Sequence, residues 1–221
     1  MNKQIKSKQR VADYGEVYTS PEIVNAMLDL VKQETERIDS RFLEPACGTG
    51  NFLVEVLKRK LDVVKKRYSR SQLDFERNLV LAVSSIYGID ILEDNVIACR
   101  QRLFEIADER YTALFKTKAK DACRRSLRYI LGKNIVWGDA LDLKTVGADP
   151  QPIIFAEWSF PLNNSMIKRR DYAFAELLPE EQQNLFSQNL HQSDLGEKKF
   201  IPKETRSYPL VHFLKIGEAY A

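Results

Sequence analysis

Glycine and aspartate residues stand where they could bind a nucleoside. Gly48 and Gly50 form a Gly-x-Gly turn behind one short apolar segment, and Asp90 and Asp139 directly follow two later ones. Glycine lets the backbone take positive φ values and approach a ligand without a Cβ in the way. A carboxylate can accept the hydroxyl hydrogens of a ribose or the amine hydrogens of an adenine. These residue types in this order indicate a site for an adenosine-containing compound.

Each feature also has a plain structural explanation. A bare Gly-x-Gly is more often an ordinary turn, and a single aspartate after a strand often only caps it. A dinucleotide site is disfavoured because its ribose-binding acid falls about 20 residues after the glycines, whereas Asp90 comes much later. The three-glycine fingerprint of such sites is absent as well. Together, the turn and the two acids favour a nucleoside cofactor over unrelated structural roles.

A parallel sheet would bring these residues together, and the apolar pattern predicts one. Helices are expected at 21–32, 52–68, 73–85, 93–115 and 121–131, and short buried strands at 41–43, 86–90, 135–137 and 152–156. In such folds, ligands bind beyond the carboxyl ends of the strands. The expected fold is therefore a Rossmann-like α/β domain with a mostly parallel central sheet and helices on both faces.

The two ends of the chain have less pattern. Residues 1–20 are expected to form a polar arm that contains a first cofactor segment, and 21–221 a single domain with a weakly patterned tail after about 178. Ser20 and Asn51 are expected to cap the helices that follow them. Toward the C-terminus we expect a helix near 172–178, a mobile loop over 180–199 and a final strand at 209–214.

Composition limits the class of protein. The 221 residues include three cysteines without a Cys-x-x-Cys pair and two histidines, too few and too scattered for a zinc site. No apolar run reaches the roughly 20 residues needed to span a bilayer, and the N-terminus lacks an export signal. We therefore expect a soluble, cytoplasmic protein without a metal and without a membrane partner.

Positive charge is concentrated in three stretches of the chain. They are 58–70, 116–133 and 168–170, within a net charge of only +3. Such an uneven distribution would suit a nucleic acid, although solvated helix faces explain basic clusters more often.

The order of these motifs resembles the adenine-specific DNA N6-methyltransferases of restriction-modification systems. The matching segments are Tyr14 to Pro21 (YGEVYTSP), Glu44 to Phe52 (EPACGTGNF), Gly88 to Ile91 (GIDI) and Gly138 to Ala140 (GDA). The second of them matches the family's cofactor motif almost letter for letter. The resemblance implies S-adenosylmethionine as methyl donor and DNA as substrate. It also implies these cofactor-binding residues: Tyr18, Thr19, Glu44, Pro45, Ala46, Gly48, Thr49, Gly50, Asn51, Phe52, Asp90, Ile91, Asp139 and Ala140.

The family's catalytic signature is missing from its expected place. That signature is Asn, Asp or Ser, then two prolines and an aromatic residue, just after the fourth strand. Its oxygens accept the hydrogens of the adenine amine while the aromatic ring stacks on the flipped base. Here the stretch reads IIFAEWSFPL, so Ser159 or Glu157 could orient the amine, and Trp158 or Phe160 could stack. Alternatively, these aromatic residues only pack in the core.

Two functions of different classes follow from the resemblance. The chain methylates adenine in DNA, or it is a catalytically inactive subunit that keeps the cofactor pocket and has a regulatory or structural role. Methylation of RNA, protein or a small molecule is a third reading, because a fold does not fix its substrate. The tail after 178 is too short for a second recognition domain, so a specificity or restriction subunit is an expected partner.

Overall fold

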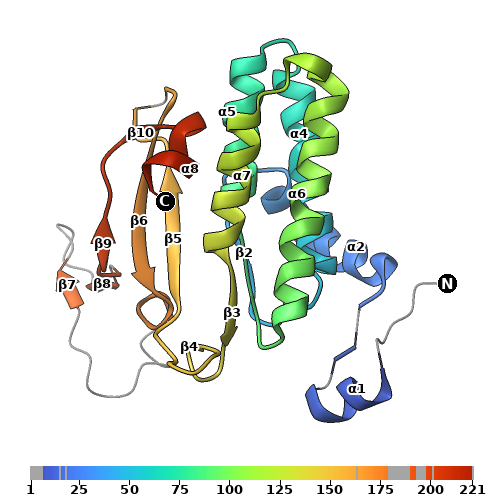
Figure 1. Cartoon of the computed structure of the whole chain (residues 1–221), viewed down its shortest axis with the longest axis vertical. Coiled ribbons are helices and arrows are strands. Elements are labelled where there is room, and N and C mark those ends of the chain that lie inside the picture. Colours follow the sequence, from blue (N-terminus) through green and yellow to red (C-terminus); the bar gives the residue numbers. More distant parts are fainter. Residues whose placement is uncertain are drawn as a thin grey trace.

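A parallel sheet of three strands stands at the centre of the fold (Figure 1). The computed structural model describes residues 7–14, 16–17, 19–162, 164–178, 190–192, 198–200 and 202–220. The strands β1 (Phe42–Glu44), β2 (Ile86–Asp90) and β3 (Ile135–Asp139) pair in this order, and the short β4 (Lys144–Thr145) pairs antiparallel with β3. Because β1, β2 and β3 are parallel, their carboxyl ends meet at one edge of the sheet.

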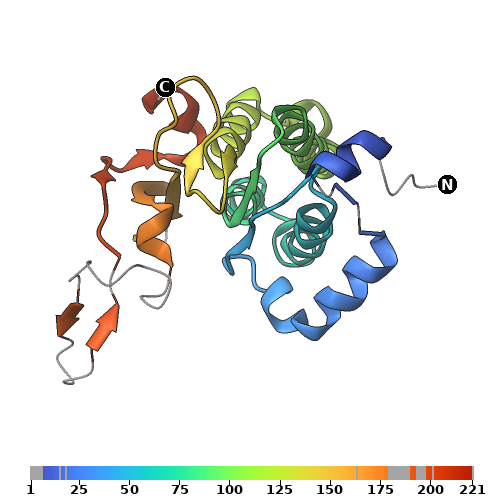
Figure 2. The same cartoon turned by 90° about the horizontal axis from the view of Figure 1, so that it is seen from below.

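Four long helices form a layer against this sheet (Figures 1 and 2). They are α4 (Asn51–Tyr68), α5 (Gln72–Ser84), α6 (Glu93–Phe115) and α7 (Asp121–Asn134), preceded by α1 (Lys8–Tyr14), α2 (Pro21–Leu30) and α3 (Lys32–Thr35), with the 3-10 turn η1 (Lys116–Lys118) after α6. The helices α4 and α6 follow the carboxyl ends of β1 and β2, whereas α5 and α7 lead directly into β2 and β3. We call the edge formed by the carboxyl ends of β1, β2 and β3 the ligand edge. The first residues of α4 and α6 therefore lie at this edge.

The apolar periodicity explains why these segments are helices. In α5, Leu79, Val80 and Val83 are fully buried against the other helices, as the pattern predicted. At the start of α2, the Ser20 hydroxyl accepts a hydrogen bond from the Ile23 N–H, and a proline occupies the first turn. The five expected helices between residues 21 and 134 and the strands β1, β2 and β3 are confirmed to within a few residues.

A second, antiparallel sheet covers the opposite face of β2 (Figure 2). Its strands are β5 (Ile154–Ser159), β6 (Met166–Ala173), β9 (Arg206–Ser207) and β10 (Val211–His212), and the turns η2 (Phe174–Leu177) and η3 (Phe213–Lys215) and the helix α8 (Ile216–Ala219) belong to the same region. A separate pair joins β7 (Leu190–Gln192) to β8 (Lys198–Phe200). Tyr87 and Ile89 of β2 pack against Ile153, Phe155 and Phe174, so β2 is buried on both faces.

The expected mostly parallel sheet with helices on both faces is corrected in two respects. The four long helices form one layer on one face of the β1 to β3 sheet, and β5 brings an antiparallel sheet to the other face (Figure 2). The sheet content is mixed, and β5 runs opposite to β2 and β3. A Cβ on Gly138, at the carboxyl end of β3, would lie 2.7 Å from Ile153 Cδ1, while Trp158 Nε1 donates to Asn134 Oδ1, just before β3 begins (3.0 Å). The cause is the connection. Thr145 N–H donates to the Gln151 carbonyl (2.8 Å), and this tight hairpin turns the chain back, whereas a parallel crossover needs a dozen or more residues, usually a helix.

The C-terminal expectations were less accurate. The helix expected near 172–178 is wrong, since β6 continues to Ala173 and only a 3-10 turn follows. The final strand expected at 209–214 is reduced to β10, with η3 after it. Apart from the short β7 and β8, the loop expected over 180–199 lies outside the described residues. Within the described part of the chain, no helix is long and apolar enough to cross a membrane.

The basic stretches are only partly free surface charge. Lys60 is fully buried, and its ammonium group donates to the carbonyls of Ile38 and Ser40 and to the Ser85 hydroxyl. The Arg169 guanidinium is buried in a two-bond ion pair with Asp171 (2.7 and 2.6 Å). Part of the positive charge is therefore used inside the fold and is not exposed to bind a nucleic acid.

Candidate functional site

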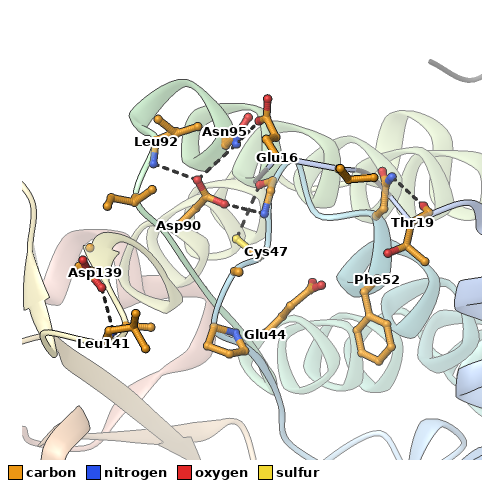
Figure 3. Close-up of a pocket in the computed structure, with 18 of the residues that line it drawn as sticks. Glu16, Thr19, Glu44, Cys47, Phe52, Asp90, Leu92, Asn95, Asp139 and Leu141 are labelled. Atoms are coloured by element: carbon orange, nitrogen blue, oxygen red, sulfur yellow. Dashed lines mark hydrogen bonds between the residues drawn. The ribbon is translucent and has the colours of Figure 1, made fainter. Parts of the chain in front are cut away.

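The carboxyl ends of β1, β2 and β3 open into one pocket of about 590 Å³ (Figure 3). The residues of the predicted cofactor set that line it are Thr19, Glu44, Pro45, Ala46, Gly48, Asn51, Phe52, Asp90, Ile91, Asp139 and Ala140. Thr49 and Gly50 belong to the same glycine turn but do not line the pocket. Tyr18 lies outside the described residues. Three separate strand ends thus contribute to a single cavity.

Asp90 connects the strand end to the glycine turn. Its Oδ2 accepts the Gly48 N–H at 2.7 Å, and its Oδ1 accepts the Leu92 N–H at 2.9 Å and the Asn95 amide at 3.3 Å. The side chain is nearly buried, yet it still lines the pocket. A carboxylate has about four lone-pair positions, so one remains for a ligand hydroxyl. Asp90 can therefore shape the turn and bind a ligand at the same time.

The glycine turn has a backbone that only glycine adopts easily. Gly48 and Gly50 have φ values of 52° and 83°. Gly50 takes the cap position before α4, so Asn51 becomes the first helical residue and makes no capping bond. The prediction that Asn51 caps this helix is wrong. Instead, its Nδ2 donates to the Thr19 carbonyl (3.2 Å), and its Oδ1 accepts from Arg102 (2.9 Å).

Glu44 places an unpartnered carboxyl group in the pocket. Its Oε2 is buried and has no hydrogen-bond partner among the described residues, and Figure 3 shows the side chain projecting between Cys47 and Phe52. Burial, with the neighbouring charge of Asp90, raises the pKa of Glu44 to about 8. A buried acceptor without a partner is costly unless a ligand satisfies it. The chemistry of Glu44 therefore suits a cationic or hydrogen-donating ligand group.

Glu44→Gln is expected to remove a pH dependence of stability. The native state keeps the Glu44 proton up to about pH 8, whereas the unfolded chain loses it near pH 4.5. Between these values the native state binds more protons, so the free energy of unfolding falls as pH rises. The variant should therefore match wild type at pH 4 and exceed its stability by about 2–4 kcal/mol at pH 9. Urea unfolding at both pH values measures this, and an equal difference at pH 4 and 9 would contradict it.

Apolar side chains surround the mouth of the pocket. Leu141 is 93% exposed and Val17 60% exposed, although both are large and apolar, and Ile91 and Met27 line the same cavity. Exposed apolar groups beside a cavity mark a ligand or protein contact. The site therefore combines carboxylates inside with an apolar rim, which suits a molecule with a ring and several polar groups.

The three candidate catalytic residues lie away from this pocket. Glu157 is paired with Arg41 and with Arg170 (2.6 Å to the latter). Trp158 is 4% exposed and packs in the core, as the alternative reading of the aromatics had it. Ser159 lines a separate hollow beside Ser85, which precedes β2. Because β5 runs opposite to β2, each step along it leads further from the ligand edge.

Sequence reasoning missed the support that α6 gives to the site. Asn95, Cys99 and Arg102 have the spacing i, i+4 and i+7, which places them on one face of the helix. Asn95 also donates to Glu16 (2.7 Å), which Arg10 holds from α1 (2.6 Å). The spacing was present in the sequence, but nothing there tells which face of α6 meets the turn. Within the described residues, no group of three or more His, Cys, Asp or Glu side chains could hold a metal ion.

Comparisons with known proteins cover the same region. Residues 21–150 match the family described as MmeI, DNA-methyltransferase domain. The chain is also 34% identical over 85 residues to "Putative type II restriction enzyme and methyltransferase RM.MjaORFECS2P" of Methanocaldococcus jannaschii. That match covers 37% of this chain and only 7% of the relative, so the chain spans a small part of the relative's length. No solved structure matches significantly.

Proposed function

Because this chain belongs to the MmeI DNA-methyltransferase domain family, we propose that its pocket binds S-adenosylmethionine as the methyl donor for adenine N6 in DNA. The observation that supports this most directly is the 2.7 Å hydrogen bond from the Gly48 N–H to Asp90, which holds the glycine turn and the acid in one pocket. The Glu44 carboxyl oxygen without a partner fits a group that donates hydrogen or carries positive charge. The glycine turn, which has no side chain in the way, lets a cofactor come close to the backbone. When bound, S-adenosylmethionine supplies an electrophilic methyl group on a sulfonium.

The residues of the pocket would share the binding as follows. Asp90 would accept a ribose hydroxyl hydrogen with its remaining lone pair, and Ile91 would cover one face of the purine. Asp139 uses Oδ1 to accept the Leu141 N–H (2.8 Å), which leaves Oδ2 for the adenine amine. Glu44, which keeps its proton at neutral pH while the pocket is empty, would lose it more readily beside the positive charge of the methionine part and would then attract that charge. All of these groups come from strand ends, so the sheet fixes their spacing.

A second candidate function is favoured by the direction of β5. The two residues that the sequence offers for orienting a target amine, Glu157 and Ser159, do not line the pocket and lie toward the opposite end of the sheet. The chain would then be the cofactor-binding subunit of a restriction-modification system, and a partner polypeptide would supply the catalytic turn and the recognition of DNA. This function keeps the pocket but requires no methyl transfer by the chain alone.

Some exposed cations of the basic stretches lie far from the pocket, which agrees with the need for a partner. Lys65, Lys66, Arg70 and Lys118 are exposed and lie near the far ends of α4 and α6. The 18 residues of α4 span about 27 Å at 1.5 Å per residue, so these cations lie far from the ligand edge. DNA bound there would not reach the pocket by itself.

Calorimetry with S-adenosylmethionine, followed by a transfer assay, tests the proposal. Duplex and single-stranded DNA of mixed sequence would be incubated with methyl-labelled cofactor, and the nucleosides analysed for N6-methyladenine. Binding with labelled adenine supports the enzyme, and binding without transfer supports the second function. Label on another base would overturn the adenine assignment, and absence of cofactor binding would remove both functions.

A further inference from the structure

We propose that Arg102 is a positioning residue for the pocket, although it does not line it. It would hold the glycine turn, and through Asn51 the Thr19 segment, in the arrangement that receives the cofactor. The expected change in cofactor affinity rests on the proposed function, whereas the expected change in the mobility of the turn rests on the hydrogen bonds of Arg102 alone. The helix α6 would thus hold in place a pocket whose lining residues come from the ends of β1, β2 and β3 and from the N-terminal segment.

The guanidinium of Arg102 makes its contacts with two residues of one turn. Its Nη1 donates to the Thr49 carbonyl at 2.6 Å, to the Thr49 hydroxyl at 3.0 Å and to Asn51 Oδ1 at 2.9 Å. No carboxylate lies within ion-pair distance of it in the described part of the chain. Hydrogen bonds from a charged donor are shorter and stronger than neutral ones. The positive charge of Arg102 is therefore directed at the turn itself.

The contact with Asn51 extends this hold to a second wall of the pocket. An amide has an oxygen that only accepts and a nitrogen that only donates. Because the Asn51 oxygen accepts from Arg102, its nitrogen must face the other way, and it donates to the Thr19 carbonyl at 3.2 Å. Arg102 thereby sets the orientation of the amide. Without it, the amide could rotate, and the Thr19 segment would lose its tie to the turn.

The rest of the α6 stripe indicates that this arrangement is rigid. Cys99 lies one turn before Arg102 and packs so closely under Gly50 that a Cβ there would come within 2.6 Å of the Cys99 sulfur. One turn earlier, Asn95 bonds to Asp90 (3.3 Å). Three consecutive contacts on one helix face therefore support the turn and the acid. Arg102 is the member of this stripe that contacts Thr49 and Asn51.

Arg102→Met and Arg110→Met form a matched pair for the test. Arg110 lies two turns further along the same helix and forms a surface ion pair with Asp62 (2.8 Å). We expect Arg102→Met to raise the Kd for S-adenosylmethionine by about 10- to 100-fold, and Arg110→Met to leave it within twofold. Hydrogen exchange of the cofactor-free proteins should accelerate at residues 48–51 in Arg102→Met only. Arg102→Lys keeps a positive charge but replaces the guanidinium by a compact ammonium group on a flexible stem, and it should give an intermediate Kd.

The outcomes separate this proposal from the proposed function. A Kd for Arg102→Met within twofold of wild type would overturn the positioning role, as would unchanged exchange at 48–51. If wild type does not bind the cofactor, the proposed function fails and the exchange comparison decides the positioning role alone. If Arg102→Met does not fold, Arg102→Lys is compared with Arg110→Lys, and equal Kd and exchange in these two variants would overturn the role.

Discussion

Gly50→Ala is expected to abolish cofactor binding and to lower the free energy of unfolding by about 2–5 kcal/mol. Two separate effects add up at this position. The backbone has a φ of 83°, which costs a residue with a Cβ about 1–2 kcal/mol. The new Cβ would also lie 2.6 Å from the Cys99 sulfur, which is fully buried, so the thiol must find another rotamer in a packed core or the turn must move. Together with the unfavourable φ, this contact should change the shape of the turn, and the pocket with it.

Gly132→Ala is the matched control for this experiment. Gly132 lies inside α7, and a Cβ there would meet nothing within 4 Å. Alanine is the better helix former, so this variant should gain about 0.5–1 kcal/mol of stability and bind the cofactor as wild type does. Urea unfolding and calorimetry measure both quantities. Equal stability changes of the same sign in the two variants would show that the turn geometry has no special role.

Asp90→Ala is expected to weaken S-adenosylmethionine binding at least 100-fold. The substitution removes the acceptor of the Gly48 and Leu92 N–H groups and of the Asn95 amide. Each buried donor left without a partner costs about 1–3 kcal/mol, so the glycine turn should also lose its position. Asp90→Asn should lose most of the affinity too, because its amide nitrogen replaces one of the two accepting oxygens.

Asp142→Ala is the control for the strand-end acid. Asp142 is an exposed carboxylate in the turn after β3, close to the pocket but outside its lining. Its removal changes the net charge by the same amount as Asp90→Ala, so any general electrostatic effect on a cationic ligand is matched. Calorimetry on both variants, with circular dichroism to establish folding, compares them. If both lose affinity equally while folded, charge alone and not the hydrogen bonds of Asp90 explains the effect.

Two features of the fold bear on how such a protein works. The elements from α2 to β3, whose strand ends line the pocket, fall within the stretch that matches the methyltransferase family. The elements after β4 form a separate antiparallel sheet. Its first strand along the chain, β5, runs away from the ligand edge. The division explains why the pocket has the expected residues while the candidates for orienting the amine are elsewhere.

The sequence by itself determined the local elements and the composition of the pocket. Apolar periodicity predicted the helices α2, α4, α5, α6 and α7, because burial of one face depends on the spacing of residues within a segment. The alternation of these helices with short apolar runs predicted β1, β2 and β3 as parallel strands. Residues at their ends, such as Gly48, Asp90 and Asp139, then had to lie at one edge, since parallel strands leave no other arrangement.

Only the tertiary structure decided the direction of β5, the role of Asn51 and the hold of Arg102 on the turn. An apolar run looks the same in a parallel and in an antiparallel strand. The hairpin closed by the hydrogen bond between Thr145 and Gln151 turns the chain back and makes β5 antiparallel to β2. The Asn51 amide depends on Thr19 and Arg102, which are 32 and 51 residues away. Such contacts between distant segments arise from the packing of whole elements, and short-range patterns in a sequence do not encode them.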